Sequence, residues 1–170
     1  TSRSLDSAQK AANQLSVFAA DSAKVLAFKA DVRDYQQQQD AVKATESSLG
    51  SIDIVIANAG LGVFGSIEDI TIEGWNQVIE TNLTGVFYTL KSTLGSLKKT
   101  KGYYITISSL AGTNFFAGGT AYNASKFGVT GFSQAAMLDL RAHGIKVSTI
   151  MPGSVSTYFN GNEPSQKDAW

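Results

Sequence analysis

Three side chains in one short segment of the sequence could move a proton to or from a carbonyl group. The segment ISSLAGTNFFAGGTAYNASK places a hydroxyl at Ser109, a phenol at Tyr122 and an ammonium at Lys126. On a helix, residues four apart lie on one face, so Tyr122 and Lys126 would project together. A neighbouring ammonium stabilises the phenolate form of a tyrosine, which suits that tyrosine to proton transfer.

The Tyr-x-x-x-Lys spacing alone is weak evidence. Tyrosine and lysine are common in this chain, and chance gives about 0.4 such matches. A structural alternative is a buried tyrosine packed under a lysine whose ammonium reaches solvent. The position of the pair is more informative, because it opens a helical segment that follows a strand and a glycine-rich loop.

The elements that must position these residues alternate along the chain. Helical spacing is expected over residues 5–20, 35–49, 72–99 and 121–142, and strands over 25–31, 52–57, 103–108 and 146–151. Ser4 and Asp34 are expected helix caps, and Gly50 is an expected helix stop. The run IDIVIA within 52–57 is nearly all apolar, which predicts a strand buried on both faces.

This alternation predicts a single α/β domain over residues 1–170. Helices of this length between strands make right-handed crossovers, so the sheet is expected to be parallel and doubly wound, with helices on both faces. The carboxyl ends of such strands meet at one edge, where ligands bind. Polar residues follow four expected strands at that edge, namely Asp31, Asn58, Ser108–Ser109 and Pro152–Gly153.

Composition excludes several classes of protein. The chain is 43% hydrophobic and 16% charged with zero formal net charge, which is globular and lacks the basic excess of a nucleic-acid binder. It has no cysteine and a single histidine, His143, so no disulfide framework or histidine metal cluster is expected. The sequence shows no signal peptide and no apolar run near the ~20 residues of a membrane span. A cytoplasmic protein without metal fits these features.

From Arg3 to about Tyr158 the chain resembles the short-chain dehydrogenase/reductase family, whose fold is Rossmann-like. The resemblance rests on Asp31–Val32, the Asn58-Ala59-Gly60 turn, Asn82 in ETNLTGVFY, Ser109 upstream of Tyr122, Lys126, and PGSVST ending at Thr157. It implies an NAD(P)-dependent oxidoreductase that transfers a hydride between nicotinamide and a carbonyl or secondary alcohol.

The resemblance also implies a catalytic role for four residues. Tyr122 would exchange the proton with the substrate oxygen, and Ser109 would hydrogen-bond and orient the carbonyl. Lys126 would bind the nicotinamide ribose and stabilise the Tyr122 phenolate. Asn82 would hold a water that links Lys126 to solvent, although a simple packing asparagine is the alternative. Neighbours in a strand point to opposite faces, so only one of Ser108 and Ser109 can face the site.

Further residues would bind the cofactor by the same resemblance, beside Tyr122 and Lys126. They are Asp31 and Val32 at the adenine, Asn58, Ala59 and Gly60 at the adenosine side, and Pro152, Gly153 and Thr157 at the nicotinamide amide and a phosphate. Asp31 could instead only cap the helix at 34–49, and Thr157 could be an ordinary turn residue.

Two further patterns bear on the cofactor. Gly60-x-Gly62-x-x-Gly65 fits the dinucleotide fingerprint after a strand, but no second strand with a terminal acid follows about 20 residues on, so we interpret it as a false match. Arg3 follows the place where the family's second strand would end. A guanidinium there favours a 2′-phosphate, so NADP(H) is expected over NAD(H), unless Arg3 is only a solvated terminal residue.

The resemblance also indicates which segments of the family's fold are absent from residues 1–170. The family's glycine-rich loop, first helix and first two strands would precede Thr1, and a further strand would follow Trp170. We therefore expect the chain to be a portion of a larger enzyme. Strands 25–31 and 52–57 should then not be hydrogen-bonded to each other, because two strands would lie between them. The last residues, GNEPSQKDAW, end without a recognisable terminating element.

The expected substrate is a small, uncharged carbonyl or alcohol, because the residues expected around it are mostly apolar: Phe64, Leu110, Phe116, Ser154 and Tyr158. A basic run at Lys98, Lys99 and Lys101 either complements a helix C-terminus or docks an acidic carrier protein, as in 3-oxoacyl-carrier-protein reductases. A nucleotide-sensing protein or an inactive fragment of the same fold is the non-enzyme alternative. Helices 72–99 and 121–142 match those that pair in family homodimers and homotetramers.

Overall fold

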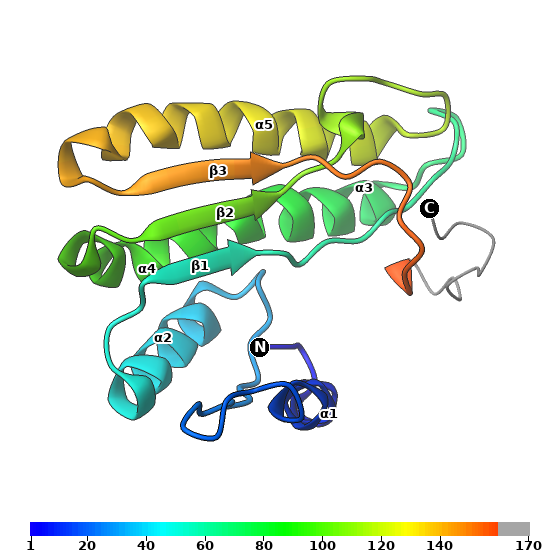
Figure 1. The fold of residues 1–170 in the computed structure, drawn as a ribbon. Helices are drawn as coiled ribbons and strands as arrows, with labels where there is room; N and C mark the ends of the chain where they lie inside the picture. Colours follow the sequence, from blue (N-terminus) through cyan, green and yellow to red (C-terminus); the bar gives the residue numbers. More distant parts are fainter. Residues whose placement is uncertain (160–170) are drawn as a thin grey trace.

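The computed structural model describes residues 1–159, in which helices and strands alternate along the chain (Figure 1). The helices are α1 (Leu5–Ser16), α2 (Tyr35–Leu49), α3 (Ile72–Ile79), α4 (Gly85–Thr100) and α5 (Thr120–Leu140). The strands are β1 (Ile54–Ala57), β2 (Tyr103–Ile107) and β3 (Lys146–Ile150). Short helical turns are η1 (Glu80–Thr84), η2 (Leu110–Gly112) and η3 (Arg141–His143). The last residues of the chain, Gly161 to Trp170, for which the sequence predicted no terminating element, lie outside the described residues.

The three strands form one parallel sheet in the order β1-β2-β3. Ile54 of β1 pairs with Tyr103 of β2, and Tyr103 pairs with Lys146 of β3. Each crossover contains a helix, which confirms the predicted α/β, Rossmann-like class of a parallel sheet with flanking helices. The carboxyl ends of the strands lie at one edge, to the right in Figure 1.

The core lies between the sheet and two helices on one of its faces. Helix α4 packs on β1 and β2, and α5 packs on β3. Tyr104 of β2 and Leu97 of α4 are fully buried there, and the Tyr104 hydroxyl donates to the Val86 carbonyl at 2.7 Å. The buried apolar set is Val55, Ala57, Val86, Leu90, Leu97, Tyr104, Val129, Ala136, Leu140, Ile145 and Val147.

The opposite face of the sheet is open within residues 1–159. Ile54 and Ile56 of β1 are 61% and 58% exposed, and Ile150 of β3 is 51% exposed. The prediction that strand 52–57 is buried on both faces is therefore wrong for this part of the chain. The physical reason is that no described helix packs on this face, so alternate side chains along β1 are exposed and buried.

The expected strand at 25–31 forms only one bridge. The Ser2 amide donates to Phe28 O at 3.2 Å, and the Ala30 amide donates to Ser2 O at 2.8 Å. One partner residue supplies too few ladder hydrogen bonds for a strand. The sequence predicted that this segment would not pair with β1, and in the described sheet it does not. Residues 28–30 lie beside residues 1–3 instead.

The local signals for the helices are confirmed. Ser4 caps α1 through Ser7 N at 3.4 Å, and Asp34 caps α2 through Gln37 N at 3.1 Å. Gly50 ends α2 with a φ of 89°, a backbone conformation that residues with a side chain rarely adopt. Helix α1 stops at Ser16 rather than at residue 20. No helix of the described part is long and apolar enough to cross a membrane.

Candidate active site

Tyr122 and Lys126 lie one turn apart at the start of α5. The Lys126 ammonium is 5.6 Å from the centroid of the Tyr122 ring, so the two side chains project together, as the spacing predicted. Lys126 is only 5% exposed, and its Nζ donates to the Ile107 carbonyl at the end of β2 at 2.9 Å. Burial lowers the pKa of Lys126 to about 8, so the ammonium remains the major form at neutral pH.

The two serines after β2 point in opposite directions. Ser108 is buried, and its hydroxyl donates to the Lys126 carbonyl of α5 at 3.2 Å. Ser109 is half-buried, and its Oγ accepts from the Ala111 amide at 3.1 Å. Strand alternation therefore places Ser108 in the core and leaves Ser109 at the edge, next to the end of β3, where Leu110 N donates to Pro152 O at 3.0 Å.

Asn82 lies in the π-helical turn η1, which joins α3 to α4 within the long helical stretch that the sequence predicted. Its side chain is 1% exposed. Its Oδ1 accepts from Leu61 N at 2.9 Å, and its Nδ2 donates to Leu61 O at 2.9 Å and to Ser125 Oγ at 3.0 Å. Asn82 therefore connects the loop after β1 to α5. π turns frequently occur at functional sites.

Ser125 and Asn123 are site residues that the sequence reasoning did not identify. Ser125 is fully buried and donates to the Tyr122 carbonyl at 2.7 Å. The Asn123 amide donates to Ala111 O and Asn114 O, both at 3.0 Å, which ties the loop after Ser109 to the first turn of α5. The available signal was their position beside Tyr122 and Lys126 in a helix that must pack on a strand.

The Asn58-Ala59-Gly60 turn passes over this cluster. A Cβ added at Gly60 would lie 3.4 Å from Asn82 Oδ1 and 3.7 Å from Lys126 Nζ, while Asn58 and Ala59 are exposed. Helix α3 begins only at Ile72, with Thr71 as its cap. The glycines of Gly60-x-Gly62-x-x-Gly65 are therefore not followed directly by a helix N-terminus, which agrees with interpreting the fingerprint as a false match.

Asp31, which the sequence predicted to lie at the adenosine, is part of a charged group. The Arg33 guanidinium holds the Asp31 carboxylate bidentately, with Nη2 to Oδ2 at 2.7 Å and Nε to Oδ1 at 3.1 Å. Hydrogen bonds from Arg33, and the charge of Arg3, hold the pKa of Asp31 below its usual range. Asp31 does not cap α2, because Asp34 does. Arg33 was missed, although a basic residue two positions after Asp31 was visible in the sequence.

Val32 and the residues after β3 complete the predicted set. Val32 packs on Gly85 so closely that a Cβ there would lie 2.8 Å from its Cγ2. A Cβ at Gly153 would lie 3.3 Å from Leu110 Cδ1, which places the Pro152–Gly153 turn beside Ser109. Thr157 Oγ1 accepts from Phe159 N at 3.3 Å, so Thr157 does shape a local turn.

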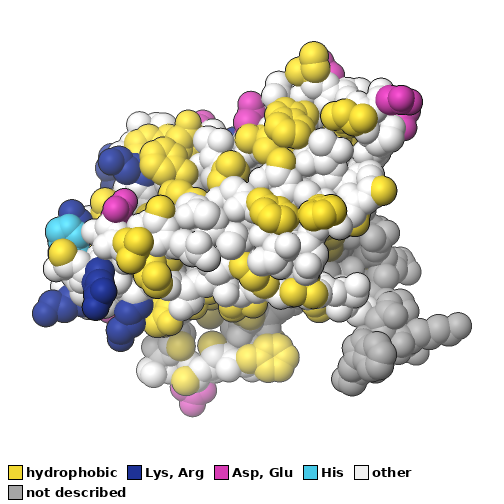
Figure 2. All heavy atoms as spheres, turned by 90° about the horizontal axis from the view of Figure 1, so that it is seen from above, with side chains coloured by type: hydrophobic (Ala, Val, Ile, Leu, Met, Phe, Trp, Pro, Cys, Tyr) yellow, Lys and Arg dark blue, Asp and Glu magenta, His cyan; other side chains and the backbone are white. Residues whose placement is uncertain are grey.

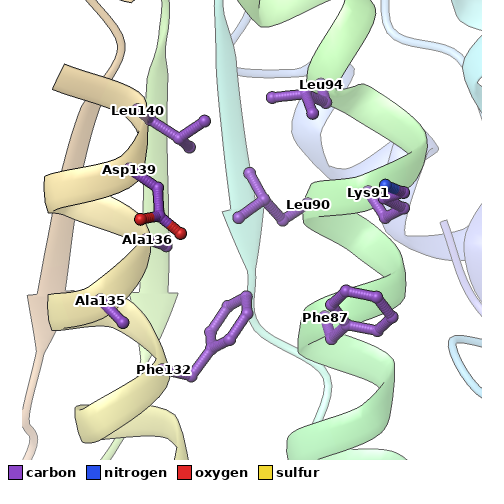
Figure 3. Close-up of a pocket in the computed structure, with 9 residues that line it drawn as sticks. All are labelled: Phe87, Leu90, Lys91, Leu94, Phe132, Ala135, Ala136, Asp139 and Leu140. Atoms are coloured by element: carbon purple, nitrogen blue, oxygen red, sulfur yellow. The ribbon is translucent and has the colours of Figure 1, made fainter. Parts of the chain in front are cut away.

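Figure 3 shows an apolar hollow of about 200 Å³ between α4 and α5, separate from this cluster. Phe87, Leu90 and Leu94 of α4 face Phe132, Ala136 and Leu140 of α5 across it. None of its lining residues is a predicted site residue. Among residues 1–159, no group of His, Asp and Glu side chains could hold a metal ion.

The basic run lies at the other end of the sheet. Lys98 and Lys99 are in the last turn of α4 and Lys101 caps it, just before β2 begins. Figure 2 shows Lys and Arg side chains gathered at one end of the molecule, together with the histidine, which is His143 of η3. These residues are at the amino-terminal ends of β2 and β3, whereas the candidate catalytic residues follow the carboxyl ends.

Comparison with known proteins is consistent across sequence and structure. A family model described as short chain dehydrogenase matches residues 1–168. Trans-4-hydroxycyclohexanecarboxylate dehydrogenase of Sinomonas cyclohexanicum is 39% identical over 127 residues, which are 75% of this chain and 49% of that protein.

Two solved structures are similar. An alcohol dehydrogenase from the archaeon Thermococcus sibiricus, complexed with 5-hydroxy-NADP, superposes with a TM-score of 0.89 at 30% identity over 97% of this chain and 68% of its own. A 3-ketoacyl-ACP reductase from Sinorhizobium meliloti 1021 gives a TM-score of 0.85 at 34% identity over 94% of this chain and 63% of its own. The chain thus spans about half the length of the curated dehydrogenase and about two thirds of the solved chains.

Proposed function

The chain belongs to the short-chain dehydrogenase/reductase family, and from that premise we propose that the full-length protein is an NAD(P)-dependent oxidoreductase acting on a carbonyl or secondary alcohol. One observation carries the proposal. Tyr122 and Lys126 share a face of α5, with the ammonium 5.6 Å from the ring centroid, at the edge where the parallel strands end.

The residues present fit the nicotinamide half of such a cofactor. Lys126 uses one of its three N–H donors on Ile107 O, so further donors are available for ribose hydroxyls. Gly60 brings backbone close to Asn82 and Lys126 without adding a side chain. Ser109 and the Pro152–Gly153 turn lie side by side at the ends of β2 and β3, where a nicotinamide amide and a substrate carbonyl could meet.

In the proposed reaction the bound nicotinamide supplies or accepts the hydride. The Tyr122 hydroxyl gives a proton to the substrate oxygen, or takes it in the reverse direction, and the buried Lys126 ammonium stabilises its phenolate form. Ser109 donates a hydrogen bond that polarises and orients the carbonyl. Asn82 holds the loop after β1 against α5, and we propose that a water on this turn connects Lys126 to solvent.

We propose NADP(H) as the preferred cofactor. Arg3 and Arg33 lie near Asp31 at the proposed adenosine side, with Glu80 also near Arg33, so two guanidinium groups are available to pair with a 2′-phosphate. The neighbouring solved structure with 5-hydroxy-NADP supports this choice. Asp31, Val32, Asn58 and Ala59 would line the adenosine, and Thr157 would contact a phosphate.

We also propose that the rest of the dinucleotide-binding domain, with its phosphate-binding loop, lies outside these 170 residues. Both the coverage of the relatives and the open apolar face of the sheet support this.

A homodimer or homotetramer is proposed through the apolar face of α4 and α5, where Phe87, Phe127 and Met137 are each more than 40% exposed. A cytoplasmic location is part of the proposal.

The test is a titration of the full-length protein with NADPH and NADH by nicotinamide fluorescence, followed by turnover with carbonyl substrates. Micromolar binding with NADPH preferred, and turnover lost in Tyr122→Phe, is expected. Binding without turnover would favour the nucleotide-sensing alternative. Absence of binding would contradict the proposal and indicate an inactive protein of this fold.

The second candidate is a 3-oxoacyl-carrier-protein reductase, favoured by the similar structure of the 3-ketoacyl-ACP reductase. The Lys98, Lys99 and Lys101 run gives it little support, because it lies at the opposite end of the sheet from Tyr122. Salt-sensitive turnover of a carrier-linked substrate, without turnover of the free thioester, would favour this candidate.

A further inference from the structure

Aromatic rings from separate segments of the chain converge on Tyr122. The Phe64 ring, in the loop after β1, lies 5.5 Å from the Tyr122 ring, and the Phe159 ring, after β3, lies 6.0 Å from it. The Phe116 ring, in the loop before α5, lies 6.1 Å from Phe64. The interplanar angles are 45° to 59°, which are tilted arrangements rather than parallel stacks.

These phenylalanines do not fill the core. Phe64, Phe116 and Phe159 are 49%, 48% and 40% exposed. Grouped exposed apolar side chains mark binding sites more often than single ones do. Their position around the only tyrosine of the candidate catalytic set places this apolar surface where a substrate would lie.

The two loops that carry Phe64 and Phe116 are held in place. Gly65 N donates to Gly118 O at 2.9 Å, so the loop of Phe64 is bonded to the loop of Phe116. Asn123 Oδ1 accepts from Phe116 N at 3.4 Å, which fixes that loop on α5. A Cβ at Gly119 would lie 2.6 Å from the Phe116 ring, so the ring is seated on a glycine. An apolar surface that is fixed before binding holds a flat group with little loss of conformational entropy.

The stretches of these loops that include the rings carry no charge. Residues 58–66, 108–119 and 151–159 contain no Asp, Glu, Lys or Arg, and the acids of the loop after β1, Glu68 and Asp69, come later, where Asp69 accepts from Ser66. A charged substrate group would lose its hydration beside the rings without gaining an ionic partner from these stretches. An aromatic group, in contrast, can pack edge-to-face on the phenylalanine rings.

We propose that the substrate is an uncharged carbonyl compound, or its alcohol, with an aromatic ring next to the reacting carbon, held by Phe64, Phe116 and Phe159. The inference rests on the proposed function, because it takes Tyr122 as the proton donor to that carbonyl. Phe64 is the main specificity-determining residue, since its ring contacts both Phe116 and Tyr122.

The test compares ketones of matched shape on the full-length protein with NADPH. The probes are acetophenone, cyclohexyl methyl ketone with the same carbon skeleton but a puckered ring, and 2-butanone. We expect kcat/KM for acetophenone to exceed that of both other ketones by about tenfold or more. Phe64→Leu, which keeps an apolar side chain, should remove most of this preference.

The matched control is Phe115→Ala. Phe115 is 86% exposed on the same loop as Phe116 and lies outside the ring contacts of the described residues, so the preference should persist. Turnover of all three ketones within about threefold, or a preference that Phe64→Leu leaves intact, would overturn the inference while the proposed function stands.

A protein that turns over none of the ketones is then tested for binding of acetophenone by saturation-transfer NMR. Binding that Phe64→Leu abolishes and Phe115→Ala preserves would support the aromatic site and count against the oxidoreductase function. Lack of binding to the wild-type protein would overturn the inference.

Discussion

The catalytic half and the adenosine half of the candidate site are built differently. Around Tyr122, the polar side chains of Asn82, Ser125 and Lys126 are at most 5% exposed, and each is hydrogen-bonded to another segment. At the adenosine side, the Arg33 and Asp31 side chains are 35% and 20% exposed and pair with each other. Buried networks tolerate little change, whereas surface charges contribute small, adjustable increments.

The largest expected effect is in the catalytic half. Tyr122→Phe removes one hydroxyl and keeps the ring that packs on Phe64 and Phe159. Because that hydroxyl is the proposed proton donor, kcat should fall by about 10³-fold, with little change in melting temperature or in cofactor Kd. The control is Tyr35→Phe, on a tyrosine of α2 whose ring packs on Tyr88. Turnover of Tyr122→Phe within tenfold of wild type would place the proton donor elsewhere.

Lys126 gives the catalytic half a pH-dependent stability. Its pKa is about 8 when folded, against 10.5 for an ordinary lysine, so between these values the unfolded chain binds more protons than the folded one. The free energy of unfolding should therefore rise with pH across that window, by roughly 3 kcal/mol from this group. Below pH 8 the cost of burying the charge is fully present.

The measurement is urea unfolding of the cofactor-free protein from pH 7 to 10.5, for wild type and Lys126→Met. The difference between the two curves isolates Lys126 from the other groups that titrate. We expect Lys126→Met to lack this part of the rise. Parallel curves would show that the lysine is solvated in the folded protein.

Asn82→Ala should lower the free energy of unfolding by about 2 kcal/mol, because it leaves the half-buried N–H and C=O of Leu61 without their partners. The control is Asn13→Ala, since the Asn13 side chain is exposed on α1 and bonds only locally to Gln9. Equal stability of the two variants would show that the hydrogen bonds of Asn82 do not stabilise the fold. It would also weaken the contrast between the catalytic and adenosine halves.

The smallest effect is expected at the adenosine half. Arg33→Ser should raise the Kd for NADPH by about five- to tenfold and change the Kd for NADH by less than twofold, because only the 2′-phosphate gains from the guanidinium. Arg141→Ala, which removes a charge at the opposite end of the sheet, is the control. Equal losses for both cofactors would assign Arg33 to structure rather than to cofactor choice.

Local signals predicted much of the fold. The caps at Ser4 and Asp34 and the stop at Gly50 depend on neighbouring residues only, so the sequence was sufficient for them. Burial of β1 on both faces could not be judged locally, because it depends on which other elements cover the sheet. The same applies to segment 25–31, because a strand there needs more pairing residues than the single bridge to Ser2 provides.

The candidate site divides in the same way. The spacing of Tyr122 and Lys126 follows from helix geometry, and alternation separates Ser108 from Ser109. The roles of Ser125, Asn123 and Arg33 depend on contacts with Asn82, Ala111 and Asp31, which the sequence pattern did not identify. The assignments of catalytic and cofactor-binding roles remain predictions for the experiments above.

The parallel pairing of the strands has a consequence for how the chain folds. Ile54 pairs with Tyr103 and Tyr103 pairs with Lys146, so each pairing joins strands separated by a whole helical crossover. No part of the sheet can form from local contacts, and loop-closure entropy is lost before the strands gain their hydrogen bonds. Folding should therefore be slow, with exposed Ile54 and Ile56 prone to self-association until the sheet is covered.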